Sequence, residues 1–102
     1  MSEARLEALG DGRFRLSGVL DVDSVPDMVG RVDELLLAPA GVEIDLGDVS
    51  RADSAGLALL VEWFRKATGQ GRSIRFCEVP AQMLALAQVS GVDRLLALEP
   101  RT

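Results

Sequence analysis

The sequence of 102 residues contains no histidine and only one cysteine. Without histidine the chain cannot build a Ser-His-Asp or Cys-His catalytic centre, and most zinc sites are excluded as well. Cys77 has no second cysteine with which to form a disulfide, so we expect it to act as a small buried hydrophobic residue. The commonest pairs of nucleophile and base are therefore excluded before any motif is considered.

Basic residues and long apolar runs are also scarce. The chain has 11 Lys and Arg against 16 Asp and Glu, which gives a formal net charge of −5 with no basic cluster. A nucleic-acid partner requires a positive surface, so none is expected. No run reaches the roughly 18 apolar residues that span a bilayer, and the first ten residues lack the pattern of a secretory signal. We expect a cytoplasmic protein with no direct membrane insertion.

Aromatic residues make up only 4% of a sequence that is 48% hydrophobic. The core must therefore consist mainly of Leu, Val and Ala. A chain of this length is sufficient for one hydrophobic core, and the prediction is a single domain over residues 1–102.

The central stretch of the chain predicts a strand that leads into a helix. Apolar and acidic residues alternate over 42–46, as in a half-buried strand, and residues 47–50 then resemble a turn. Asp53 and Ser54 are both suitable N-caps for a helix predicted from about 55 to 69. The Ser54 hydroxyl is expected close to the positive end of that helix dipole.

The remaining elements follow from the same patterns. The predicted elements are strands at about 3–9 and 12–19, a helix over 25–36, a strand over 73–78 and a helix from Pro80 to Gly91. Residues 93–99 are ambiguous between a last strand and a short helical turn. This order predicts an α/β domain with a mixed four- to five-stranded sheet and about three helices, mainly on one face. The parallel crossovers place the strand 42–46 in the middle of the sheet.

Two motifs carry a resemblance to a known family. Asp45-Leu46-Gly47-Asp48-Val49 is followed by Asp53-Ser54-Ala55-Gly56-Leu57, and the flanking runs are Ser17 to Asp21 and Val89-Ser90-Gly91-Val92. The sequence resembles the STAS family, named after sulfate transporters and anti-sigma-factor antagonists. The resemblance covers nearly the whole chain. It implies the STAS fold and a non-catalytic module that binds proteins and needs no cofactor or metal.

The resemblance points to two branches of this family. The bare domain and the run Gly56-Leu57-Ala58-Leu59-Leu60 look like the small cytoplasmic subunit of the Mla-type ABC phospholipid transporter. That subunit binds the ATPase subunit and so lies peripheral to the inner membrane, in a system that maintains outer-membrane lipid asymmetry. The alternative is an anti-sigma factor antagonist, in which the serine matching Ser54 is phosphorylated by a partner kinase, the anti-sigma factor.

The helix after Ser54 predicts where a partner binds. At 100° per residue, Leu57, Leu60, Val61, Phe64 and Thr68 cluster on the face expected to meet the core. Leu59 and Trp63 then form an outward apolar ridge beside Ser54, unless another helix covers it. The predicted contact residues are Arg51, Ser54, Ala55, Gly56, Leu59 and Trp63.

Plainer interpretations of the same residues stay open. Ser54 can be no more than a helix cap, since serine is common at that position. As a catalytic nucleophile it would need an adjacent base, but the only lysine, Lys66, lies three turns further along the helix. Asp45, Asp48 and Asp53 resemble a magnesium site only in their shared charge, and hydrogen bonding within their own loops is the preferred explanation.

Overall fold

Alternating apolar residues build a four-stranded sheet with one buried face. The structure, a computed structural model, describes residues 3–39 and 41–101. The strands are β1 (Ala4–Gly10), β2 (Arg13–Leu20), β3 (Val42–Ala52) and β4 (Ile74–Cys77), and their order in the sheet is β1-β2-β3-β4. β1 pairs antiparallel with β2, whereas β3 runs parallel to both β2 and β4. The predicted mixed sheet with β3 in its interior is confirmed.

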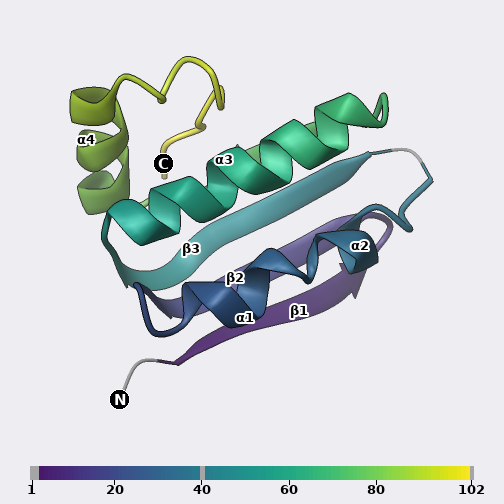
Figure 1. Cartoon of the computed structure of the whole chain (residues 1–102), viewed down its shortest axis with the longest axis horizontal. Coiled ribbons are helices and arrows are strands. Elements are labelled where there is room, and N and C mark those ends of the chain that lie inside the picture. The colour runs from purple at the N-terminus through teal and green to yellow at the C-terminus, as the bar shows by residue number, and fades with distance from the viewer. Residues whose placement is uncertain (1–2, 40, 102) are drawn as a thin grey trace.

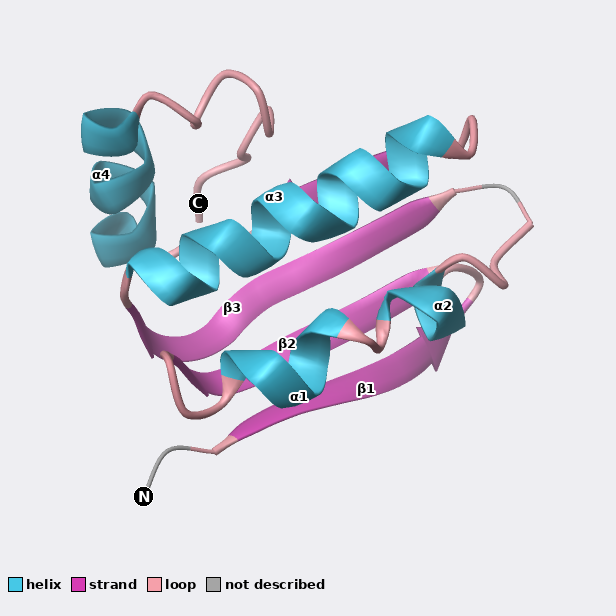
Figure 2. Ribbon diagram, viewed as in Figure 1, coloured by secondary structure: helices cyan, strands magenta, loops and turns pink. Residues whose placement is uncertain are grey.

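The helices lie mainly on one face of this sheet (Figures 1 and 2). They are α1 (Val25–Val29), α2 (Val32–Leu35), α3 (Ser54–Gly69) and α4 (Ala81–Ser90). The long α3 crosses the sheet above β3, α1 and α2 lie above β1 and β2, and α4 stands at one end. The α/β STAS fold predicted from the sequence is confirmed.

Two local predictions differ from the structure, and the ambiguity over residues 93–99 is resolved against a strand. β3 does not end at residue 46 but continues to Ala52, with register shifts opposite β2 that absorb the turn-like residues. The helix predicted over 25–36 is broken into α1 and α2 at Gly30 and Arg31, because glycine disfavours a continuous helix. The ambiguous segment 93–99 is neither a strand nor a regular helix. It is a series of turns that buries Leu96.

The face of α3 that meets the core is only partly the one predicted, since Leu57 and Leu60 are buried as expected but the centre of the face lies elsewhere. Trp63, Leu59 and Leu60 are fully buried, and Gly56 and Ala67 lie on the same side of the helix. Phe64 and Val61 are only half-buried, and Thr68 is exposed. The outward ridge of Leu59 and Trp63 predicted from the sequence is therefore wrong. The buried face is rotated about the helix axis by about a quarter of a turn from the predicted face. The reason is that Gly56 and Ala67 allow close packing on a side of α3 where the sequence has few large apolar residues.

Trp63 joins α3 to α1. Its indole Nε1 donates a hydrogen bond of 3.3 Å to the backbone oxygen of Met28, and neither group is exposed to solvent. A buried indole usually needs such a partner for its N–H. This bond holds α3 and α1 side by side above the sheet.

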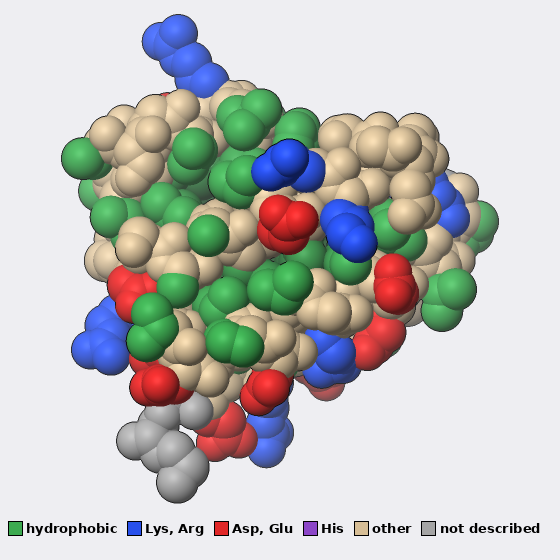
Figure 3. Space-filling model, in the orientation of Figure 1, with side chains coloured by type: hydrophobic (Ala, Val, Ile, Leu, Met, Phe, Trp, Pro, Cys, Tyr) green, Lys and Arg blue, Asp and Glu red, His purple; other side chains and the backbone are tan. Residues whose placement is uncertain are grey.

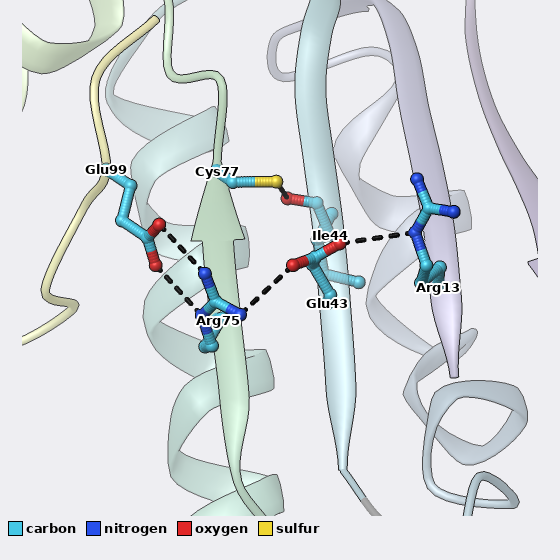
Figure 4. Close-up of polar contacts among 6 residues, drawn as sticks. All are labelled: Arg13, Glu43, Ile44, Arg75, Cys77 and Glu99. Carbon is cyan, nitrogen blue, oxygen red and sulfur yellow. Dashed lines mark hydrogen bonds and ion pairs between the residues drawn. The ribbon is translucent and has the colours of Figure 1, made fainter. Parts of the chain in front are cut away.

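The opposite face of the sheet is lined by charged residues. Arg13 pairs with Glu43 at 3.3 Å, Glu43 with Arg75 at 3.1 Å, and Arg75 with Glu99 at 2.9 Å (Figure 4). These pairs connect β2, β3, β4 and the C-terminal segment in one row. Hydrogen bonding to Arg75 lowers the pKa of the Glu99 carboxyl. Because the pairs are exposed, they contribute little to stability and mainly align the strands.

We predict that Trp63 is a core residue whose loss destabilises the fold. Trp63→Phe removes the indole donor, although the Met28 oxygen still accepts from the Arg31 N–H, and should lower the free energy of unfolding by about 0.5–1.5 kcal/mol. Trp63→Ala also opens a cavity and should cost about 3–5 kcal/mol. Lys66→Ala, on the exposed side of α3, is the control and should stay within about 0.5 kcal/mol of the wild type. Urea denaturation measures all three, and a Trp63→Ala variant as stable as Lys66→Ala would contradict the burial.

Candidate functional site

The ends of three elements meet where β3 passes into α3. The backbone N–H of Asp53 donates to the Leu20 oxygen at the end of β2, over 3.1 Å. From α4, the amide of Gln82 accepts from the Ala52 N–H at 3.1 Å and donates to the Ala52 oxygen at 2.7 Å. Both backbone groups of Ala52 are thereby paired with one side chain. The loop that carries Ser54 is held by β2 on one side and α4 on the other.

Asp53 caps α3, and Ser54 is the first residue of the helix. The Asp53 carboxylate accepts a hydrogen bond of 2.8 Å from the backbone N–H of Ala55. Ser54 is exposed, and within residues 3–39 and 41–101 its hydroxyl has no hydrogen-bond partner. The capping role predicted for Asp53 is confirmed, while the same role for Ser54 is wrong. The Ser54 hydroxyl is therefore available for other interactions at the positive end of a long helix.

Gly56 is required by the packing of the protein itself. A Cβ atom added there would lie 2.9 Å from the Leu20 Cβ, 3.0 Å from the Ala52 Cβ and 3.1 Å from the Leu20 oxygen. Only glycine lets the first turn of α3 pass this close to the end of β2. Gly56 is buried, so its prediction as a partner-contact residue is wrong.

The six predicted contact residues thus divide into two groups. Arg51 and Ser54 are exposed and Ala55 is half-buried, all at the β3–α3 junction. Gly56, Leu59 and Trp63 face the core and cannot offer a surface to a partner. The β3–α3 junction is therefore accessible to a partner, whereas the predicted ridge of Leu59 and Trp63 is buried.

An apolar groove that the sequence analysis missed begins at Ser54. It has a volume of about 400 Å³ and runs between α3 and the end of α4. Residues that line it include Ser54, Ala58, Val61, Arg65, Ser90 and Val92. Two further apolar side chains from α4 and the turns after it are exposed, Val89 by 88% and Leu95 by 51%. In Figure 3 hydrophobic side chains gather over α4, the C-terminal turns and the adjoining part of α3.

The groove explains why α3 has apolar residues outside the face that meets the sheet. Val61 was assigned to the core, although it is half-buried and faces the groove. Val92 follows Gly91, whose left-handed φ of 76° ends α4 and turns the chain back toward α3. The wide apolar face of α3 serves two surfaces, one toward the sheet and one toward the groove.

The three aspartates near the site each have a structural role. Asp45 accepts a hydrogen bond of 2.7 Å from the Gly47 N–H, and Asp53 caps α3. Asp48 forms an ion pair of 3.6 Å with Arg15. Among the residues that the structure describes, no group of three or more acidic, histidine or cysteine residues could hold a metal ion. The loop-bonding interpretation is confirmed for Asp45 and Asp53.

Cys77 lies at the end of β4 and is half-buried, so it is less buried than expected. Its thiol donates to the Ile44 oxygen at 3.6 Å (Figure 4). Burial raises the pKa of the thiol, and the nearby Glu43 and Asp45 carboxylates raise it further. The thiol therefore stays protonated at neutral pH, which makes it a poor nucleophile.

Comparison with known proteins now identifies the family. Residues 5–98 match the family described as "Mlab, STAS domain". The chain belongs to the STAS domain family. Such domains are generally non-catalytic modules that bind partner proteins. No helix of the described chain has the length and apolar character to cross a membrane.

Relatives of this STAS chain include anti-sigma factor antagonists. It is 26% identical over 92 residues to an anti-sigma-B factor antagonist of Bacillus subtilis (strain 168), covering 90% of this chain and 84% of the relative. An anti-sigma factor antagonist from Mycobacterium paratuberculosis has a similar structure, with a TM-score of 0.78 at 21% identity, covering 98% of this chain and 86% of the other. Unphosphorylated SpoIIAA gives a TM-score of 0.74 at 16% identity, covering 98% and 89%. At these identities the solved structures show the fold alone.

We predict opposite outcomes for two glycines of α3. Gly56→Ala forces Leu20 or the β2 end to move and should lower the free energy of unfolding by about 1–3 kcal/mol. Gly69→Ala is the matched control, because its Cβ meets no atom within 4 Å. Since alanine favours a helix over glycine, Gly69→Ala should be neutral or raise stability by up to about 1 kcal/mol. Equal effects of the two changes in thermal or urea denaturation would argue against close packing at Gly56.

Proposed function

We propose that this STAS domain is the non-catalytic accessory subunit of an Mla-type ABC phospholipid transporter. In this role it binds the ATPase subunit and lies peripheral to the inner membrane through that complex. The observation that carries the proposal is the family match over residues 5–98, whose description names Mlab. The bare domain and the motif Asp53-Ser54-Ala55-Gly56-Leu57 agree with it.

The geometry supports the junction and the adjoining groove as the binding surface. Ser54 is exposed and its hydroxyl has no partner in the described chain, while the groove beside it is apolar and open to solvent. An exposed apolar surface with a few polar groups at its rim is typical of protein interfaces. The Glu62–Arg65 pair, 4.0 Å apart, leaves the groove without a strong net charge. We therefore expect a partner element with an apolar face, such as an amphipathic helix.

An anti-sigma factor antagonist is the second candidate, and the Bacillus subtilis relative favours it. In that branch Ser54 would be the phosphorylated residue. A phosphate at the N-terminus of α3 would be stabilised by the helix dipole, although the Ala55 N–H is already bonded to the Asp53 carboxylate. The neighbouring Asp53 carboxylate would oppose it. The two candidates share a surface and differ in the partner and in the chemistry at Ser54.

We predict that charge introduced along this surface abolishes partner binding without unfolding the domain. Ser54→Arg and Ala58→Glu each place a charged side chain where a partner would exclude water, and an unpaired buried charge costs several kcal/mol. Ser54→Ala should leave stability nearly unchanged, because Asp53 provides the cap. Lys66→Glu, on the exposed side of α3 outside the groove, is the control and should bind normally.

Co-purification from cells, with mass spectrometry of the captured proteins, tests the proposal. An ABC ATPase recovered with the wild type and with Lys66→Glu, but not with Ser54→Arg or Ala58→Glu, is the expected result. A histidine-kinase-like anti-sigma factor, together with phosphoserine in the intact mass, would replace the first candidate by the second. In that case Ser54→Glu should mimic the non-binding state and Ser54→Ala should bind constitutively. Full recovery of partner with Ser54→Arg would show that the site lies elsewhere.

A further inference from the structure

β1 leaves one edge of the sheet unpaired. It is the first strand in the order β1-β2-β3-β4, and among residues 3–39 and 41–101 it pairs only with β2 (Figure 1). The Val19 N–H donates to the Glu3 oxygen over 3.0 Å, so Glu3 faces β2. Hydrogen-bonded positions alternate along an antiparallel pair, and Arg5 and Glu7 therefore also face β2 with their backbone groups.

The residues between them point their backbone groups outward. By the same alternation, the N–H and C=O groups of Ala4, Leu6 and Ala8 lie along the free edge. Such an edge is a template for a further strand unless the protein blocks it with proline, charges or a covering segment. No proline occurs in β1, and in the described chain no other strand pairs along its outer side. Its two charged residues, Arg5 and Glu7, have opposite signs, so they disfavour only strands whose charges do not complement them.

The side chains of β1 carry a pattern that is complementary to itself. Arg5 and Glu7 project from the face of the sheet opposite the helices, where their side chains are 79% and 63% exposed. Within the described chain they form only long, exposed ion pairs, Arg5 with Glu3 at 3.6 Å and Glu7 with Arg15 at 3.8 Å. On the helix-covered face Ala4 and Leu6 are half-buried against the core. When two copies of such a strand pair antiparallel about a two-fold axis, the arginine of each copy can lie opposite the glutamate of the other.

We propose that two copies of this chain associate through antiparallel pairing of their β1 strands, with Leu6 opposite Leu6 of the second copy. In this register Ala4 lies opposite Ala8 of the second copy, so the outward backbone groups meet and hydrogen-bond. Arg5 lies opposite Glu7 of the second copy, and Glu7 opposite its Arg5. Opposite charges that face each other across a strand pair are stabilising.

Neighbouring registers are unfavourable. A shift that centres the pair on Arg5 places two arginines opposite each other, and one centred on Glu7 does the same with two glutamates. Shifts in between place outward backbone groups opposite inward ones, so the ladder cannot form. Among the registers centred on Arg5, Leu6 and Glu7, charge and hydrogen bonding therefore favour the one centred on Leu6.

The proposed interface and the α3–α4 groove are at different edges of the sheet. β1 is one edge strand, whereas the groove lies on the side of β3 and β4. A two-fold axis perpendicular to the joined sheets keeps both helix layers on the same side. The dimer would thus present two grooves in one direction. This inference does not depend on which partner occupies the groove.

Charge reversal tests the register. Arg5→Glu makes positions 5 and 7 both acidic and Glu7→Arg makes them both basic, so each variant alone should be monomeric in sedimentation equilibrium where the wild type is dimeric. An equimolar mixture of the two variants should dimerise again, because acidic positions then face basic ones. Native mass spectrometry should show the mixed species in preference to either homodimer. Lys66→Glu changes the charge as much as Arg5→Glu does, lies on exposed α3, and should remain dimeric.

Two results would overturn the proposal. One is a wild type that stays monomeric throughout a concentration series. The other is dimerisation of Arg5→Glu or Glu7→Arg alone to the wild-type extent, which would place any interface elsewhere. Circular dichroism of each variant shows that the fold is retained. Partner capture through the groove is measured separately and should be unaffected by either charge reversal, so the two proposals can fail independently.

Discussion

The close approach of α3 to the end of β2 is the contact on which the rest of the structure depends. Gly56 allows it, because any side chain there would meet Leu20 and Ala52 at or near 3 Å. The first turn of the helix is thereby pressed onto the sheet. Its exposed side then carries Ser54 at the surface, and its buried side carries Trp63 down to α1. The position of the candidate site is a consequence of this packing.

The site is rigid at its base and open at its surface. Asp53 is bonded to β2 and to its own helix, and Gln82 of α4 pairs with both backbone groups of Ala52. Above this base lie the Ser54 hydroxyl, which has no hydrogen-bond partner among the described residues, and the apolar groove. Fixed geometry beneath an exposed apolar surface suits recognition of another protein, since little order has to be gained on binding. Nothing in this arrangement requires chemistry by the domain itself.

The sequence predicted the strands, the order of elements and the family, because these depend on short-range patterns. Alternation over 42–46 and the cap at Asp53 are local signals, and both are present in the structure. The orientation of α3 could not be predicted in the same way. Its buried face includes Gly56 and Ala67, and residues this small do not stand out as core positions in a hydrophobic pattern. Their role appears only when the close distance to β2 is known.

The groove escaped prediction for a related reason. It is made by α3 together with the turn after α4, two segments that are far apart in the sequence. Val61 and Val92 are ordinary apolar residues in their own segments, and only the fold brings them together beside Ser54. The extension of β3 to Ala52 was missed because bulges let turn-forming residues remain in a strand. Long-range packing thus decided both surfaces of α3.

The most direct test of the central claim is hydrogen–deuterium exchange of the domain, free and in complex with its captured partner. We predict slower exchange in the complex at the start of α3 and over residues 90–92, because Ser90 and Val92 line the groove. The backbone amides of β2 around Arg13 and of β4 around Arg75, whose side chains form the charged face, should exchange at the same rate in both states. Protection confined to those amides of β2 and β4, with residues 54–65 and 90–92 unchanged, would contradict the assignment of the junction and groove as the partner-binding surface.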